Sequence, residues 1–436
     1  MLEDVARLLE EQPLCDRCLG RLYARLGRGW SNKDRGRALK MTVIMWLHRG
    51  AAEGSVEAKR RLKVVTANAG EMGRELYKHL YGEDPGEALC SICGSKLDKA
   101  IEELAGEAVK VLRLYDARRI VVGARVSQDI LEAEDRVKAG HGLKYGESIK
   151  AEIRREVGKL LRDRHGYTID FEEPDAMVIV SFPSLAVEIQ NNSLLLRGRY
   201  WKRGRMISQA YWPTPTGPKY YSIEQAAWSL LQLTGGETIV LHAAGREDVD
   251  ARMLGTGRPM ILEVKNPRRR YISLKELEEA ANRGAPGLVE FGLTGKASRR
   301  DVQFYKEEAS GKSKIYKALV LLEEPIDLER LKAAVETLKS ATISQWTPRR
   351  VLHRRRNLLR RRKVLDMDCT LLHSSLAECI IKTEGGLYVK ELISGDGGRT
   401  SPSLSEILGV GATCIELDVL GVEAPDIELL EERGSI

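Results

Sequence analysis

The segment at residues 245–258 concentrates charged side chains that could act in catalysis. Its sequence, GREDVDARMLGTGR, places three acids and three arginines between two apolar runs that we expect to be strands. Cations around a carboxylate lower its pKa and keep it ionised, so that it can act as a nucleophile. Charge alone does not choose between Asp248 and Asp250, because residues two apart in an extended segment face the same side. A surface turn with satisfied ion pairs explains the composition equally well.

Four of the seven cysteines form two pairs with the spacing of metal ligands. Two residues separate Cys15 from Cys18 and Cys90 from Cys93, and such a turn lets two thiolates reach one tetrahedral ion. The 71 residues between the pairs exceed the span of a usual zinc ribbon, which a helical insertion around residues 34–63 would explain. We expect one structural zinc, with two buried reduced pairs or a redox CxxC as alternatives. The other cysteines are scattered and are expected to be core thiols: Cys369, Cys379 and Cys414.

A basic block at residues 349–363 suggests nucleic acid as a partner. Its sequence, RRVLHRRRNLLRRRK, contains nine lysines or arginines and no acid. A surface helix normally mixes both signs of charge, so a block of one sign favours a phosphate backbone as partner. A solvated basic helix or loop is the alternative. The residues expected to contact RNA are Arg349, Arg350, Arg354, Arg355 and Arg356.

Composition narrows the class of protein. Of the 436 residues, 43% are hydrophobic, which suffices for several buried cores and excludes wholesale disorder. The longest apolar run, residues 41–47, is far shorter than the ~20 residues that span a bilayer. The acidic, amphipathic start of the chain does not resemble a signal peptide. We expect a soluble, cytoplasmic protein with no membrane partner.

The sequence lacks the usual motifs for organic cofactors. The GKS at residues 311–313 has no earlier P-loop glycine, and no GxGxxG follows a strand. The seven histidines form neither an HExxH nor a deaminase motif. These absences disfavour dehydrogenases, methyltransferases and catalytic zinc enzymes.

The element pattern predicts an α+β protein. Residues 1–95 are expected to be helical, with the cysteine pairs near their ends, and residues 96–210 to combine helices with short strands. The segment YWPTPTG at 211–217 is expected to be an interdomain linker. Residues 218–436 alternate strands and helices and are expected to form one mixed domain.

Several segments resemble, in the same order, motifs of the archaeal and eukaryotic tRNA pseudouridine synthases that act on the TΨC arm. The segments are CDRCLGR (15–21), CSIC (90–93), GREDVDARMLGTGRP (245–259), NPRRR (266–270), SKIYKALV (313–320), SQWTPRRVLHRRRNLLRRRKV (344–364) and GGLYVKELISGDGGRTSPSLSEILG (385–409). The resemblance implies a catalytic domain with a mixed, mainly antiparallel sheet and helices. It also implies an accessory RNA-binding domain over residues 1–210, THUMP-like at 96–210.

The resemblance also implies roles for individual side chains. Asp248 occupies the position of the family's catalytic aspartate, and Arg246 precedes it in the arginine-x-aspartate register. Tyr316 matches the tyrosine that stacks on the flipped uracil. Lys390 matches a basic residue that pairs with the aspartate, and Leu392 would wall the pocket. From pattern alone, Tyr316 is equally well a strand core residue and Lys390 a solvated charge on a strand.

The implied activity is that of an isomerase that converts uridine to pseudouridine at tRNA position 54, 55 or both. Such a reaction needs a carboxylate at the ribose and a pocket for the freed uracil, and it uses no cofactor. The expected partner is tRNA, with no obligate protein partner, and the zinc is structural. We expect Asp250 to pair with Arg252 or Arg258. A non-catalytic tRNA-binding or chaperone-like protein is the alternative.

Overall fold

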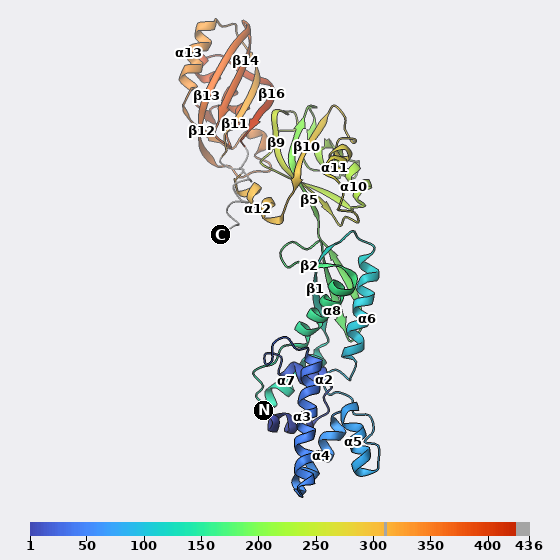
Figure 1. Ribbon diagram of the computed structural model, residues 1–436. Coiled ribbons are helices and arrows are strands. Elements are labelled where there is room, and N and C mark those ends of the chain that lie inside the picture. The colour runs from blue at the N-terminus through green and yellow to red at the C-terminus, as the bar shows by residue number, and fades with distance from the viewer. Residues whose placement is uncertain (309–311, 424–436) are drawn as a thin grey trace. The chain divides into compact units, whose positions relative to one another are not determined.

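The computed structural model of the protein describes residues 1–308 and 312–423. Contacts divide the chain into two compact units, the first comprising Met1–Asn192 and the second beginning at Ser193. Both units contain helices and strands (Figure 1), so the fold is α+β, as the sequence predicted. No helix in the described part of the chain has the length and apolar character that a membrane crossing requires.

The first unit joins a helical segment to a small sheet. Its elements are α1 (Leu2–Glu11), α2 (Asp16–Leu22), α3 (Asn32–Ala52), α4 (Val56–Asn68), α5 (Glu71–Tyr81), α6 (Leu97–Leu112), β1 (Arg119–Val126), α7 (Gln128–Gly140), α8 (Ile149–His165), β2 (Thr168–Ile169), β3 (Ala176–Phe182) and β4 (Val187–Asn191). The strands lie in the order β2-β1-β3-β4, with β1 parallel to both neighbours and β4 antiparallel to β3. Helices α6 and α8 pack against this sheet, and one hydrophobic core joins it to the helical segment.

Local sequence signals set the limits of these helices. Helix α8 begins after Ser148, whose hydroxyl accepts a hydrogen bond from the backbone N–H of Ala151. It ends at Gly166, whose φ of 75° lies in the left-handed region that favours glycine. Ser31 and Ser55 cap α3 and α4 in the same way as Ser148 caps α8. Because α3 and α4 lie between the two cysteine pairs, the insertion is helical and accounts for their wide separation.

The second unit is built around a large sheet. Its elements are β5 (Leu194–Lys202), β6 (Ile207–Ser208), β7 (Tyr221–Ser222), α9 (Ile223–Ala226), α10 (Ser229–Thr234), β8 (Thr238–Ala243), β9 (Arg252–Lys265), α11 (Leu274–Ala281), β10 (Val289–Lys296), α12 (Arg299–Glu308), β11 (Lys314–Leu322), α13 (Leu328–Leu338), β12 (Thr342–Trp346), η1 (Arg349–Val351), β13 (Leu359–His373), β14 (Leu376–Thr383), α14 (Val389–Ser394), β15 (Thr400–Ser401), α15 (Leu404–Leu408) and β16 (Ala412–Val422). The strand order is β10-β5-β9-β16-β11-β14-β13-β12-β15, and β8 pairs with β9. Pairing in this sheet is antiparallel except between β16 and β9.

Two hydrophobic cores flank the centre of this sheet. One packs α13, α14 and α15 on β11 to β14, and the other packs α9, α10 and α11 on β5, β9 and β10. One face of strand β11 contributes residues both to a hydrophobic core and to the lining of a cavity. Its buried residues Ala318, Val320 and Leu322 alternate with outward-facing positions, and Lys314 and Tyr316 share their face nearer the start of the strand. Tyr316 contacts both cores.

The division between the units differs from the expected boundary at residue 210. Strand β5 pairs with β9 and β10, so residues 194–202 complete the sheet of the second unit. The segment 211–217 consequently lies inside the second unit, between β6 and β7. Hydrophobic alternation identifies a strand but not its pairing partner, and the partners of β5 follow it by more than 50 residues.

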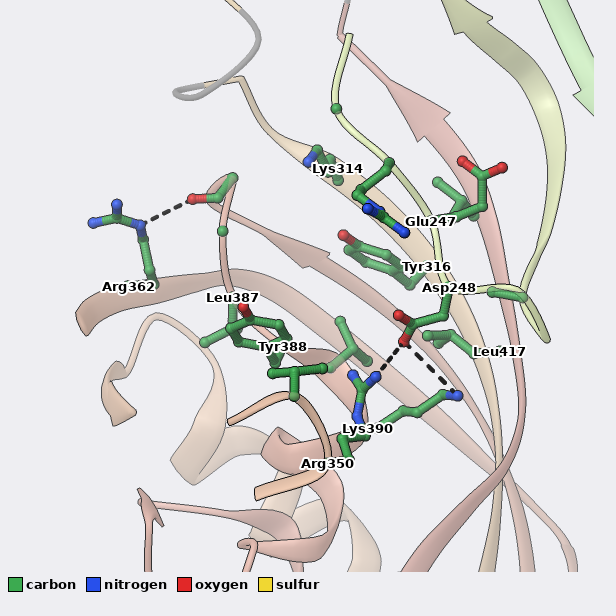
Figure 2. A pocket seen from close by; sticks show the side chains of 18 of the residues that line it. Glu247, Asp248, Lys314, Tyr316, Arg350, Arg362, Leu387, Tyr388, Lys390 and Leu417 are labelled. Carbon is green, nitrogen blue, oxygen red and sulfur yellow. Dashed lines mark hydrogen bonds and ion pairs between the residues drawn. The ribbon is translucent and has the colours of Figure 1, made fainter. Parts of the chain in front are cut away.

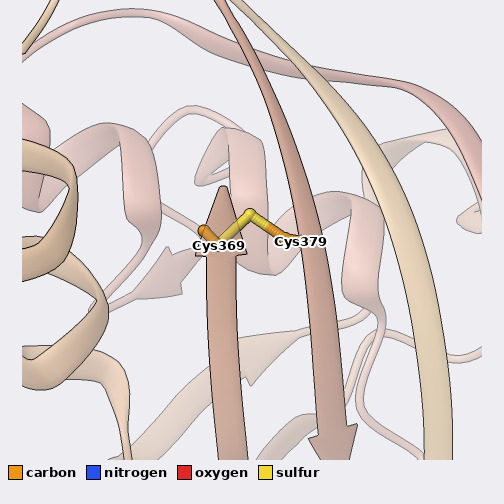
Figure 3. Close-up of a disulfide and its surroundings, with 2 residues drawn as sticks. All are labelled: Cys369 and Cys379. Carbon is orange, nitrogen blue, oxygen red and sulfur yellow. A yellow bond between two sulfur atoms is a disulfide. The ribbon is translucent and has the colours of Figure 1, made fainter. Parts of the chain in front are cut away.

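The expectation of free core thiols at Cys369 and Cys379 is wrong, because these residues form a disulfide (Figure 3). They lie directly opposite each other in β13 and β14, with their Cα atoms 4.1 Å apart. Spacing alone could not show this pairing, because it depends on the register of the two strands. Cys414 is a free, partly buried thiol that donates to the carbonyl of Glu416.

Candidate active site

The second unit contains a cavity of about 530 Å³, within the range of about 300–1,000 Å³ typical of small-ligand sites. Its walls come from segments far apart in the sequence (Figure 2): the loop between β8 and β9, part of β9, the start of β11, η1 and the loop after it, the start of β13, residues 385–390, and β16. The charged segment at residues 245–258 therefore does not form an ordinary surface turn, because its first half borders this cavity.

A buried lysine anchors the loop that carries the two candidate aspartates. Lys202 on β5 is 1% exposed, and its Nζ atom donates hydrogen bonds to the backbone carbonyls of Ile207, Asp248 and Val249 at 2.9–3.2 Å. Burial lowers the pKa of the Lys202 ammonium group. Gly245 begins the turn with a φ of 78°, which favours glycine.

Glu247 is the structural acid of this loop. Its carboxylate is 1% exposed, accepts a hydrogen bond from Arg258 Nε at 2.8 Å, and also accepts one from the Tyr200 hydroxyl at 3.0 Å. With these partners the buried carboxylate is satisfied, and Glu247 also belongs to the lining of the cavity. Sequence reasoning gave Glu247 and Arg258 no such role, since their contact depends on the pairing of β8 with β9.

Asp248 presents its carboxylate to the cavity. Its side chain is 31% exposed, and Oδ2 lies 2.8 Å from Arg350 Nη1 and 3.9 Å from Lys390 Nζ (Figure 2). Arg350 also contacts Glu391, with Nε 2.7 Å from Oε1, so the guanidinium is held from two sides. The nearest cation to Asp248 is therefore Arg350, which the sequence placed among the phosphate contacts.

The expectation that Asp250 pairs with Arg252 or Arg258 is wrong. Lys390 Nζ lies 2.6 Å from Asp250 Oδ2, while Arg252 pairs with Asp418 and Arg258 pairs with Glu247. Burial alone would raise the pKa of Asp250, but the hydrogen bond from Lys390 outweighs it and holds the pKa below its usual value. Lys390 lies on helix α14 and not on a strand. It thus contacts both aspartates, with the shorter distance to Asp250.

The aromatic and apolar walls of the cavity differ partly from the expected ones. Tyr316 lines the cavity beside Asp248 (Figure 2), and burial raises the pKa of its hydroxyl to about 12. Leu392 is fully buried in the core beneath α14 and does not line the cavity. Leu387 and Leu417 contribute apolar surface instead. Lys390 and Leu392 both lie on helix α14. Because a helix turns by about 100° per residue, two residues that are two positions apart point in different directions, so only Lys390 reaches the cavity.

Part of the basic block lines the same cavity. Residues 349–363 form the η1 turn, an irregular loop and the beginning of β13, so they do not form a helix. The cavity is lined by Arg350, Arg354, Arg355, Arg360 and Arg362, and exposed Arg246 joins them from the β8–β9 loop. Arg349 and Arg356 are exposed outside the lining.

Tyr388 organises several of these arginines. The guanidinium groups of Arg350 and Arg360 each lie 5.9 Å from the centre of its ring, and Arg355 Nη1 donates to its hydroxyl at 3.3 Å. Sequence reasoning missed Tyr388, Arg360 and Arg362 as individual site residues. The one hint in the sequence was that Tyr388 lies two residues before Lys390, which was already a candidate site residue.

The four paired cysteines come together in the first unit. Their sulfur atoms all lie within 4.8 Å of one another, and Cys15 Sγ is 3.6 Å from Cys93 Sγ. Zinc bonds of about 2.3 Å to four sulfurs would hold them about 3.8 Å apart, so these donors fit a tetrahedral metal ion. Buried Arg21 donates to Cys18 Sγ at 3.5 Å and to Glu134 and Glu152. This network ties the cluster to α7 and α8.

Comparison with known proteins identifies the family. The family model described as "Pus10, C-terminal" matches residues 195–423, and "Pus10 THUMP domain, archaeal" matches residues 104–181. A protein of Aeropyrum pernix named "tRNA pseudouridine synthase Pus10" is 54% identical over 97% of both chains. The chain belongs to the Pus10 family. A Pus10 protein of Ignisphaera aggregans with the same name is 40% identical over 96% of this chain and 98% of its own.

Solved structures show weaker likenesses than the Pus10 sequences. A Cbf5-Nop10-Gar1 complex contains a chain with a TM-score of 0.30 and 18% identity, covering 52% of this chain and 49% of its own. A pseudouridylate synthase gives a TM-score of 0.21 and 14% identity, covering 66% and 86%. Membership of the Pus10 family rests on the sequence matches, and it makes this protein an isomerase with a THUMP domain in its first unit.

Proposed function

We propose that the protein isomerises uridine to pseudouridine in the TΨC arm of tRNA, at position 54, position 55 or both. The observation that carries the proposal is Asp248, a partly exposed carboxylate that borders the cavity beside Tyr316 and is bound to Arg350. The names of the Pus10 relatives support tRNA as the substrate. The TΨC arm follows from the resemblance of the motifs around Asp248, Tyr316 and Lys390.

The reaction breaks the bond between C1′ of the ribose and N1 of uracil and forms a bond between C1′ and C5. A proton leaves C5 and N1 gains one, so the substrate and the product have the same atoms and no electrons are exchanged. Asp248 acts at the ribose, either by forming an ester with C1′ or by promoting elimination. Arg350 holds its carboxylate in place. The Tyr316 hydroxyl stays protonated at neutral pH, and its ring offers a face for the uracil.

Turnover of an unmodified tRNA transcript tests the proposal. The protein should modify an excess of transcript, and carbodiimide-dependent primer extension should locate pseudouridine in the TΨC arm. Transcripts with cytidine in place of uridine 54 or uridine 55 assign the position. Stoichiometric binding without turnover would instead support a non-catalytic tRNA-binding protein.

Two matched substitutions test the choice of carboxylate. Asp248→Asn removes the charge without opening a space, so folding and tRNA affinity should survive while turnover is lost. Asp250→Asn is the same change two residues on, and it should keep measurable activity. An active Asp248→Asn with an inactive Asp250→Asn, both folded and binding tRNA, would show that Asp250 is the reacting group.

We also propose that Cys15, Cys18, Cys90 and Cys93 hold one structural zinc ion. Four thiolates are the donor set that structural zinc prefers, and the network around Arg21 places the cluster inside the core of the first unit. The cluster would stabilise the fold and take no part in the isomerisation.

A further inference from the structure

Lys314 is a cation of the cavity to which the mechanism above assigns no role. It is the first residue of β11 and lies two positions before Tyr316, on the same face of the strand. Both side chains line the cavity. Figure 2 shows the Tyr316 side chain between Lys314 at one end and the pair Arg350 and Lys390 at the other.

Three cations that reach the aspartate loop from other elements, Arg350, Lys390 and Arg258, have acidic partners in the protein. Arg350 binds Asp248 and Glu391, Lys390 binds Asp250, and Arg258 binds Glu247. Lys314 differs, because no hydrogen bond or ion pair among residues 1–308 and 312–423 involves its ammonium group. Its surroundings also disfavour the positive charge. Burial, followed by the nearby charge of Arg258, lowers the pKa of Lys314 to about 8, and the charge of Glu247 offsets only part of this effect.

A mostly buried cation without a direct ion-pair partner is costly to the folded protein, and an anionic ligand would reduce that cost. The uracil of the bound substrate is neutral and carries negative charge only after its bond to C1′ breaks, so it supplies no counter-charge when the substrate binds. An RNA substrate carries a phosphate on each side of every nucleotide. Lys314 lies two positions from Tyr316 on the same strand face, so it is close to the ring on which the uridine is proposed to stack.

We propose that the Lys314 ammonium binds a backbone phosphate adjacent to the target uridine and so positions the nucleotide over Tyr316. The inference rests on the proposed function, because it takes an RNA as the substrate. The phosphate on Lys314 and the aspartate held by Arg350 would then fix the nucleotide at opposite ends of the cavity.

Salt dependence of tRNA binding tests this role. In Lys314→Met, affinity should fall roughly 10- to 100-fold, as expected for one hydrogen bond to a charged group. The slope of log Kd against log salt should fall by about 0.7–0.9, the value for one phosphate contact. Lys317→Met is the matched control. It removes the same charge from the same strand, but Lys317 lies on the opposite face, outside the cavity, and pairs with Glu378. Its slope should be unchanged.

Methylphosphonates, which are uncharged, identify the group that Lys314 binds. Placed singly on either side of the target uridine, one of them should weaken binding to the wild-type protein. The same change should cost Lys314→Met nothing further. Lys314→Arg should restore the sensitivity, which separates lost contact from lost folding.

Two results would overturn the inference. One is a folded Lys314→Met protein whose salt slope is unchanged. If that protein also bound tRNA more weakly, Lys314 would contact the uracil and not a phosphate. The other is an equal methylphosphonate effect in the wild type and Lys314→Met. Failure of the proposed function would look different from failure of this inference, because the wild-type protein would then bind the same tRNA without forming pseudouridine.

Discussion

The guanidinium of Arg350 lies 2.8 Å from the carboxylate of Asp248 and thereby joins the basic block to the aspartate loop. The two residues are about 100 positions apart in the sequence. Glu391 holds the same guanidinium from helix α14, so three segments meet at one ion-pair network. A residue expected to bind phosphate thus also positions the candidate nucleophile.

Arg350→Gln should therefore lower the single-turnover rate by about 10- to 100-fold, the cost of one hydrogen bond between charged groups. The affinity for tRNA should change much less, because several other arginines line the cavity. Lys390→Met should reduce the rate less than Arg350→Gln, since Lys390 lies 3.9 Å from Asp248. A larger loss in Lys390→Met, with both proteins folded, would show that Lys390 is the dominant cation.

Features encoded within short segments were predictable from the sequence. Each CxxC pair forms a local turn, so the residue spacing alone indicated the cluster that the structure brings together. The charged loop was recognisable because its flanking runs are apolar and become β8 and β9. The resemblance then identified Asp248 and Tyr316 as site residues, and both line the cavity.

Features that depend on strand pairing were not predictable in the same way. The contact of Asp248 with Arg350, the disulfide between Cys369 and Cys379, and the membership of β5 in the second sheet all depend on register between distant segments. Hydrophobic periodicity reports which face of a strand is buried but carries no information about its neighbour.

The arginines of the loop after η1 should contribute to the electrostatic part of tRNA binding. Arg354 and Arg355 line the cavity, whereas Arg356 does not. Replacing all three by alanine should reduce the slope of log Kd against log salt by up to ~2–3 units. Most of this change should already appear in the Arg354→Ala/Arg355→Ala variant. An unchanged slope in the triple variant would mean that the loop does not contact phosphates.

Protein purified without added metal should contain about one zinc per chain, as measured by elemental analysis. Cys90→Ser should lose the metal and lower the unfolding temperature of the first unit, because its thiol lies in the core there. Cys414→Ser serves as the control, since Cys414 is a free thiol of the second unit. Full zinc content and unchanged stability in Cys90→Ser would contradict the assignment.

The disulfide between Cys369 and Cys379 closes a short loop, with a sequence separation of 10. Replacing both cysteines by alanine should lower the free energy of unfolding by about 2–3 kcal/mol, the chain-entropy value for such a loop. Denaturant unfolding under non-reducing conditions measures the difference. Under reducing conditions, the two proteins should become nearly equal in stability. Mass spectrometry that finds both thiols free in the native protein would refute the linkage.

Lys202 should act on the reaction through the position of the aspartate loop. Its buried Nζ atom donates hydrogen bonds to the backbone carbonyls of Asp248 and Val249, and Lys202 does not line the cavity. Lys202→Met keeps the length of the side chain but removes these donors, so the loop loses its anchor while the cavity arginines stay in place. We expect a fall in the single-turnover rate of more than 10-fold with little change in tRNA affinity, because each lost hydrogen bond to a charged donor is worth about 1.5–3 kcal/mol.

Comparison with Lys317→Met, a charge removed from an outward-facing position, separates this effect from a general loss of positive charge. If Lys202→Met folds and keeps its rate but binds tRNA more weakly, the lysine serves the RNA-binding surface and not the aspartate.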